Sequence, residues 1–112
     1  TQELGYRDQA DMFADVKAAY EQAARDVHAF GVIPSGEMMQ RLIKNGFAPV
    51  HRDTFHAHFG YGRYALAALW FDLLTGCDVR GNAFRALDVP SESVDFALIQ
   101  RLAHELADEY RA

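Results

Sequence analysis

The feature that most constrains the fold of this chain is a long apolar stretch with a single charge. Residues 62–75 are predicted to form a helix that stops at Gly76, and Asp72 is the only charged side chain between residues 64 and 74. A helix without a polar face is stable only when other elements cover most of its surface. We therefore expect this helix to be buried on most sides, whether by the rest of the chain or by something outside it.

Apolar residues at steps of three and four predict three further helices. The stretches with this pattern are residues 8–29, 36–45 and about 91–110. Ser35 is the expected N-cap of the second of them. The apolar run 30–33 is typical of a short buried strand, which Pro34 closes because proline donates no backbone hydrogen bond.

A single strand needs a neighbour, because its backbone groups must find hydrogen-bonding partners. Two interpretations follow. In the first, a segment outside these residues supplies the rest of a sheet and covers the apolar helix. In the second, the chain is a compact helical domain and residues 30–33 are only an extended connection. The pattern alone favours neither.

Size and charge exclude several classes of function. The chain has 112 residues, which fits one small domain, and 11 basic against 16 acidic residues give a formal charge of −5. Because the basic residues are scattered, we expect no nucleic-acid partner. No apolar stretch approaches the roughly 20 residues of a bilayer span, so we expect no membrane insertion. Cys77 is the only cysteine, which excludes an internal disulfide and a multi-cysteine zinc site.

Asp53 and His56 carry the clearest indication of chemistry. They lie three residues apart in a predicted loop over residues 47–60. A carboxylate that fixes the tautomer of an imidazole turns it into an effective general base. The alternative is structural: the aspartate caps a local turn and the histidine is its partly exposed neighbour. The spacing by itself is short and common, so the surrounding residues have to decide between the two.

Those surroundings resemble the C-terminal part of SGNH (GDSL-type) hydrolases, in particular a bacterial branch first catalogued as a domain of unknown function. The resemblance covers most of residues 8–76 and, more loosely, the final helix. It rests on an Ile-Pro-x-Gly turn at 33–36, an Arg-Asp-x-x-His block at 52–56, a Gly-Arg-Tyr helix start at 62–64 and a Trp-Phe…Leu-Thr-Gly ending at 70–76.

The resemblance implies an α/β fold. Residues 1–112 would be a single region, the C-terminal portion of a three-layer α/β/α domain, seen alone as four helices plus one or two short strands. It also implies a serine esterase that acts on small esters, such as acetylated carbohydrates. Asp53 would be the orienting acid of its triad and His56 the general base. His58 and Arg63 are weaker candidates, for contacts with the substrate.

The nucleophile that such a triad needs is not evident in this sequence. Its serines are Ser35, Ser91 and Ser93, and none lies in a Gly-Asp-Ser block or a Gly-x-Ser-x-Gly elbow. We therefore expect these 112 residues to be inactive alone, and we expect no cofactor.

A metal site is the rival interpretation of the same loop. His51, Asp53, His56 and His58 are all of ligand type and fall within eight positions. Their spacing matches no standard zinc motif, so we expect no metal there.

The second function class is a non-catalytic helical domain for interaction or oligomerisation. The apolar helix would then be covered by another copy of the chain or by a missing N-terminal segment. By their position in the apolar helix, Trp70 and Phe71 are expected in the core.

Overall fold

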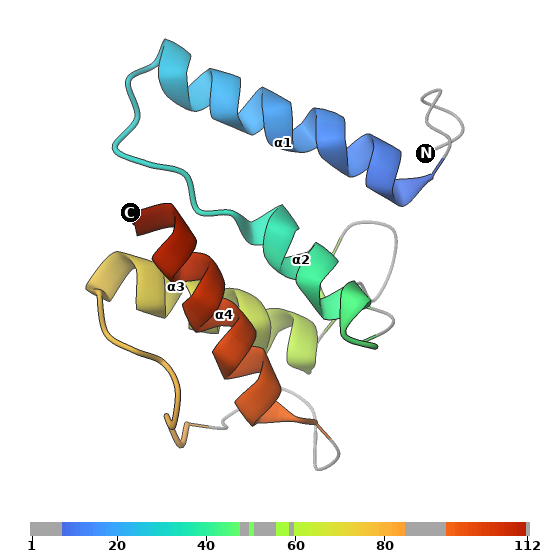
Figure 1. The fold of residues 1–112 in the computed structure, drawn as a ribbon, viewed down its shortest axis with the longest axis vertical. Helices are drawn as coiled ribbons and strands as arrows, with labels where there is room; N and C mark the ends of the chain where they lie inside the picture. Colours follow the sequence, from blue (N-terminus) through green and yellow to red (C-terminus); the bar gives the residue numbers. More distant parts are fainter. Residues whose placement is uncertain (1–7, 48–49, 51–55, 59, 85–93, 112) are drawn as a thin grey trace. The chain divides into compact units, whose positions relative to one another are not determined.

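The computed structural model describes residues 8–47, 50, 56–58, 60–84 and 94–111. Four helices form in this part of the chain: α1 (Gln9–Asp26), α2 (Ser35–Lys44), α3 (Tyr61–Thr75) and α4 (Phe96–Arg111) (Figure 1). The chain divides into two compact units, residues 1–32 and residues 33–112.

The expected α/β fold is wrong. The described residues are helical and include no strand, so they are not the sheet-bearing portion of a three-layer α/β/α domain. Residues 30–33, predicted as a strand, form an irregular connection between α1 and α2. The physical reason lies in the second unit, where α3 buries one side against other helices and needs no sheet for that purpose.

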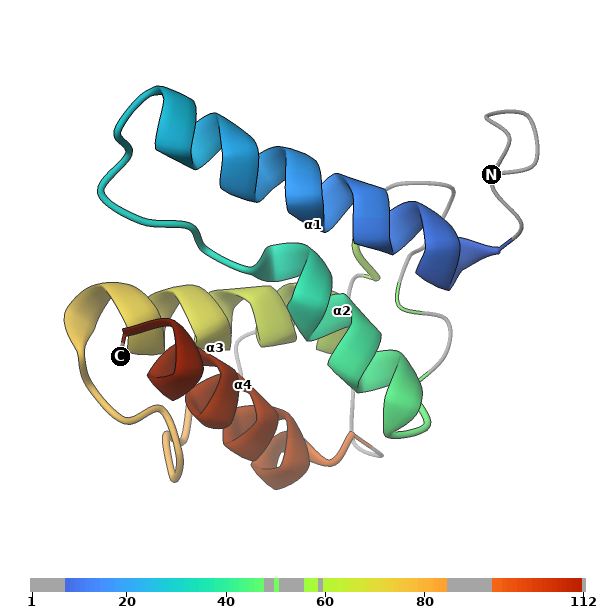
Figure 2. The same ribbon diagram turned by 45° about the horizontal axis from the view of Figure 1, so that its top comes forward.

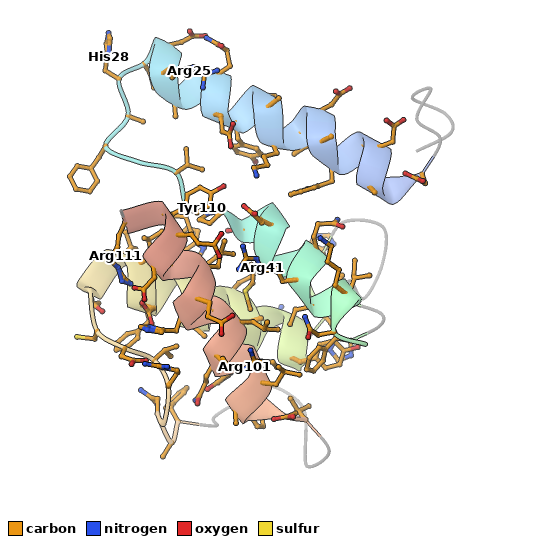
Figure 3. The ribbon with its side chains drawn as sticks, in the orientation of Figure 1. Arg25, His28, Arg41, Arg101, Tyr110 and Arg111 are labelled. Carbon is orange, nitrogen blue, oxygen red and sulfur yellow. The ribbon has the colours of Figure 1, made fainter. Side chains whose placement is uncertain are left out.

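The first unit is built on α1. Asp8 caps the helix, since its side chain accepts a hydrogen bond of 2.8 Å from the backbone N–H of Asp11. The helix ends at Asp26, earlier than the predicted stop at Gly31. His28 follows with φ of 54°, a left-handed backbone that residues other than glycine rarely adopt. Figure 3 shows His28 at this exit from the helix.

The second unit packs α2, α3 and α4 around one core, as Figure 2 shows. The largest buried apolar side chains are Met38, Leu42, Leu69, Ile99 and Leu106. The most extensive packing joins α3 to α4. Gln100 donates a hydrogen bond of 2.7 Å to the Tyr64 hydroxyl near their starts, and Arg111 meets Asp72 near their ends.

Polar contacts fix α2 against the end of α4. The Tyr110 hydroxyl donates to Glu37 at 2.8 Å, and the Arg41 guanidinium lies 2.7 Å from the Glu109 carboxylate. Figure 3 labels Arg41 and Tyr110 at this junction. The hydrogen bond to Glu109 raises the pKa of Arg41. These contacts tie the two helices that cover α3 to each other.

Ser35 does not cap α2 as predicted. It is the first residue of the helix, Pro34 holds the N-cap position, and no side chain caps this end. The Ser35 hydroxyl instead accepts a hydrogen bond of 3.1 Å from the Trp70 indole Nε1. A polar contact across the unit has therefore replaced a local cap.

The predicted stop of α3 is confirmed, because Gly76 adopts a left-handed φ of 74° and its N–H bonds the Asp72 carbonyl. Burial on most sides is wrong. Trp70 is 48% exposed, Phe71 39% and Leu74 63%, so the expected core positions of Trp70 and Phe71 are wrong too. The outer side of α3 is left open, since α2 and α4 pack on its inner side. No helix in the described part of the chain combines the length and apolar character needed to cross a bilayer.

Candidate functional site

The predicted catalytic pair lies where the chain enters α3. His56 is exposed and sits in a bend, while Asp53, like His51 and Arg52, lies outside the described residues. The distance between the Asp53 carboxylate and the His56 imidazole therefore stays a prediction. What the structure does describe is the frame that holds the two ends of this loop.

This frame consists of Val50, His58 and Gly62, which hold the two ends of the loop together. The backbone N–H of His58 donates to the Val50 carbonyl at 2.8 Å, which joins the two ends of the segment 50–58. Gly62, in the first turn of α3, lies against this junction. A Cβ at this glycine would stand 2.9 Å from the Val50 carbonyl oxygen and 3.0 Å from the His58 Cβ. Only glycine allows the helix to approach the loop so closely.

The His58 ring fastens the same junction. Its Nδ1 accepts a hydrogen bond of 3.0 Å from the Gly60 N–H, so the ring proton of the neutral imidazole resides on Nε2. The ring stacks on Tyr61 with centroids 4.2 Å apart and planes 10° from parallel. Tyr61 also packs against Phe47, and burial raises the pKa of its hydroxyl. These contacts give His58 an anchoring role, whereas its predicted contact with substrate stays a prediction.

Arg63 is exposed in the first turn of α3, and its backbone N–H bonds the His58 carbonyl at 2.9 Å. Arg63 follows His56 and His58 closely in the sequence, so the three predicted side chains belong to one short segment. Its predicted contact with substrate is likewise a prediction.

A second polar group, which the sequence did not predict, surrounds Asp72. This side chain is fully buried. Its carboxylate accepts hydrogen bonds from the Val79 backbone N–H at 3.0 Å and from Arg111, and lies 2.8 Å from His104 Nδ1. A buried carboxylate is tolerated only when it is paired in this way. Figure 3 places Arg111 at the end of α4, above the end of α3.

Two more carboxylates face the His104 ring from its rim. Asp78 lies 3.3 Å from Nδ1, and Asp108 lies 3.3 Å from Nε2. Arg80 lies 2.6 Å from the Asp78 carboxylate, and its hydrogen bonds hold the pKa of Asp78 below the usual range. The cluster is thus a network of aspartates, a histidine and arginines that joins α3, α4 and the loop after α3.

Among the described residues, Asp72, Asp78 and His104 are the group whose ligand atoms come close enough for one metal ion, within 4.8 Å. Arg111 already neutralises Asp72, and Arg80 neutralises Asp78. Arg111 also lies 3.3 Å from Asp108, so three carboxylates share two arginines, and the contacts fit a structural ion-pair network. Of the rival metal set predicted from sequence, His51 and Asp53 lie outside the described residues.

The signal for this network was present in the sequence. Asp72 is the only charge in an apolar helix, and a charge in such a place requires partners. The His104 side chain is only 16% exposed, and its position on an amphipathic helix does not show by itself that it meets Asp72. What the sequence did not show was which residues of α4 would face α3.

Comparison with known proteins gives one finding. The model of a protein family described as "Domain of unknown function (DUF4886)" matches residues 3–105. No curated protein and no solved structure matches the chain.

Proposed function

This chain belongs to the DUF4886 family, and we propose that it supplies the general base and the orienting acid of a serine-type ester hydrolase. His56 is the base and Asp53 the acid. The finer relationship, to SGNH hydrolases, is part of the same proposal and rests on the Arg-Asp-x-x-His block at 52–56. The family description does not specify a reaction, so the proposal rests on the identity and spacing of Asp53 and His56.

The observation that carries the proposal is the placement of His56. It is exposed on a loop whose base is fixed by the His58–Val50 hydrogen bond and by the close approach of Gly62. A general base must reach a proton on a partner group while its backbone stays in place. The hydrogen bond and the close approach at the base of this loop support the second requirement, because they hold the backbone on either side of His56.

The chemistry would run as acyl transfer to water. His56 takes the proton of a serine hydroxyl as the oxygen attacks the ester carbonyl, and then gives that proton to the departing alcohol. Water releases the acyl group from the serine in a second step of the same kind. Asp53 holds the imidazole in the tautomer that accepts the proton and stabilises the imidazolium that forms.

The serine belongs to a segment that is not among these 112 residues. Ser35 is engaged with Trp70, and Ser91 and Ser93 lie outside the described residues in a stretch without a nucleophile motif. The reading frame upstream of Thr1 is therefore the simplest check. A Gly-Asp-Ser block after a strand pattern supports the proposal, whereas a gene that starts near Thr1 without one contradicts it.

The decisive assay uses the longest natural gene product and p-nitrophenyl acetate. His56→Ala should lower kcat by a factor on the order of 10⁶, because a triad without its base loses nearly all covalent catalysis. His28→Ala, which removes another exposed histidine, is the matched control and should leave the rate unchanged. The 112-residue chain alone should be no faster than free imidazole at the same concentration. Equal rates for His56→Ala and the control would end the role assigned to His56.

A non-catalytic interaction domain is the second candidate, and one observation favours it. The outer side of α3 exposes large apolar side chains, among them Trp70 and Leu74. Apolar surface of this kind commonly marks a docking site. The two candidates are compatible, since His56 precedes α3 and the exposed side runs along the helix itself.

A further inference from the structure

The outer side of α3 has a regular arrangement. Its side chains recur at steps of three and four, which places them on one face of the helix. This outer face, as we call it, consists of Arg63, Leu66, Ala67, Trp70, Phe71 and Leu74. All are exposed except the half-buried Leu66. Arg63 is its only charge, because Asp72 points into the core.

The middle of the outer face is hollowed. Ser35, Leu66, Ala67 and Trp70 line a shallow, mainly apolar hollow of about 330 Å³. The hydrogen bond from the Trp70 indole to Ser35 fixes the aromatic wall, and Ala67 contributes the smallest side chain of the lining. The hollow is therefore preformed, with a large side chain beside a small one.

We propose that a second copy of this chain docks on the outer face, with the two α3 helices antiparallel. The face is complementary to itself in that orientation. A register that places Ala67 opposite the partner's Trp70 also places Leu66 opposite the partner's Phe71. The same register sets Arg63 opposite the partner's Leu74. Every residue of the outer face then has a counterpart, as a two-fold interface requires.

Shape supports this register. The hollow over Ala67 lies next to Trp70, so two antiparallel copies place each indole over the other's alanine. Large side chains packed against small ones allow helices to approach without voids. The fixed Trp70 ring loses little conformational entropy on docking, which lowers the cost of association.

Charge selects the antiparallel orientation. Arg63 lies in the first turn of α3, whereas the last turn contains no basic residue of its own and receives one hydrogen bond from Arg111 of α4, at the Asp72 carbonyl. The C-terminal end of a helix carries partial negative charge on its carbonyls. Antiparallel packing brings each Arg63 to that end of the partner helix, whereas parallel packing would set the two arginines side by side. Arg63 is thereby assigned to an interface, independently of the proposed catalytic role of His56.

The test begins with the oligomeric state of the 112-residue chain. The outer face supplies far fewer residues than the roughly 20–30 on each side of a stable interface, so we expect reversible association between about 5 µM and about 500 µM in sedimentation velocity. Trp70 is the only tryptophan, so its fluorescence should shift to shorter wavelength over the same range. A chain that stays monomeric with unshifted emission overturns the proposal and leaves the outer face to another segment.

A charge exchange separates the interface from effects on folding. Arg63→Glu and Leu74→Lys should each weaken association about tenfold, by removing the attraction or placing two cations together. The double variant should recover it, because the same pair is then oppositely charged. Far-ultraviolet circular dichroism checks that each variant is folded. A double variant no better than the single ones would contradict this register.

Cross-linking reports the orientation. In a Cys77→Ser background, Arg63→Cys combined with Leu74→Cys should form a disulfide-linked dimer on mild oxidation, and Arg63→Cys alone should not. The two positions are about 16 Å apart within one helix, too far for a bridge inside one chain. Efficient cross-linking of the Arg63→Cys variant alone would show parallel packing and overturn the proposal.

Discussion

At the scale of the residue, Asp72 shows how one side chain can organise a core. Its carboxylate is fully buried and has three kinds of partner: a backbone N–H from the following loop, the His104 ring and the Arg111 guanidinium. A buried ion pair adds little net stability compared with apolar packing, yet the loss of one member is costly. We therefore expect Asp72 to act mainly on the choice of the surfaces through which α3 and α4 pack. Its effect on the stability of that packing is the smaller one.

We predict that Asp72→Asn lowers the free energy of unfolding by about 3 kcal/mol, because Arg111 loses its buried counter-charge while the shape is kept. Urea denaturation measures the change. Asp108→Asn, at the exposed rim of the same network, is the matched control and should cost less than about 1 kcal/mol. Similar losses for the two variants would mean that the buried carboxylate has no special role.

Gly62 is a second residue whose identity the packing dictates. We predict that Gly62→Ala costs about 1–2 kcal/mol, since the added Cβ pushes on the Val50 carbonyl, although alanine favours the helix. The same variant of the natural gene product should lose esterase activity in kcat. Gly31→Ala has open space around its Cβ and serves as the control in both measurements. An unaffected Gly62→Ala variant would show that the loop base adapts freely.

At the scale of the element, α3 has two unlike sides. Its inner side places Leu69 in a fully buried position against the other helices, and its outer side leaves Leu74 63% exposed. The helix is apolar on both sides, so its sequence has no polar stripe from which to tell them apart. The neighbours of α3 decide which side is buried.

Two leucines of this helix make the distinction measurable. We predict that Leu69→Ala lowers the free energy of unfolding by about 2–5 kcal/mol, through lost burial and the cavity left behind. Leu74→Ala should change it by less than about 0.5 kcal/mol at a protein concentration below the range of the proposed association. Guanidinium denaturation at a fixed, low concentration gives both values. Equal costs would mean that the outer face is covered within one chain.

The sequence predicted local features well and long-range partners poorly. The existence of four helices and the glycine stop of α3 are confirmed, because spacing and end signals are local properties. The strand at 30–33 and the sheet were wrong, since a short apolar run is equally compatible with a connection. The burial of Trp70 and the pairing of Asp72 with His104 depend on which helix faces which, and that information is not local.

At the scale of the whole molecule, stability depends on pH through its paired acids. Arg80 lowers the pKa of Asp78 from its usual 3.8, so the pair adds stability when the carboxylate is ionised. That contribution is present above the ordinary pKa and is lost as pH falls through the lower folded value. The Asp78 side chain is 43% exposed, so solvent and salt screen the interaction.

We predict that Asp78→Asn destabilises the chain slightly at pH 7 and that the difference from the parent shrinks as pH falls below about 4. Thermal melts at several pH values test this. Adding about 1 M salt at pH 7 should reduce the same difference, because it screens an exposed pair. A difference that grows in acid would contradict the assigned ion pair.

The junction of Val50, His58 and Gly62 makes the segment between residues 50 and 58 a suitable place for inserting foreign peptides. It fixes both ends of the segment between residues 50 and 58 in one place, beside the first turn of α3. The entropy of closing a loop grows slowly with its length, by about 0.6 kcal/mol for each doubling. Foreign peptides inserted between these two positions should therefore be accommodated at small cost, with α2, α3 and α4 still folded beneath them. We therefore expect the length of this segment to be changeable while the helical frame of residues 33–112 stays the same.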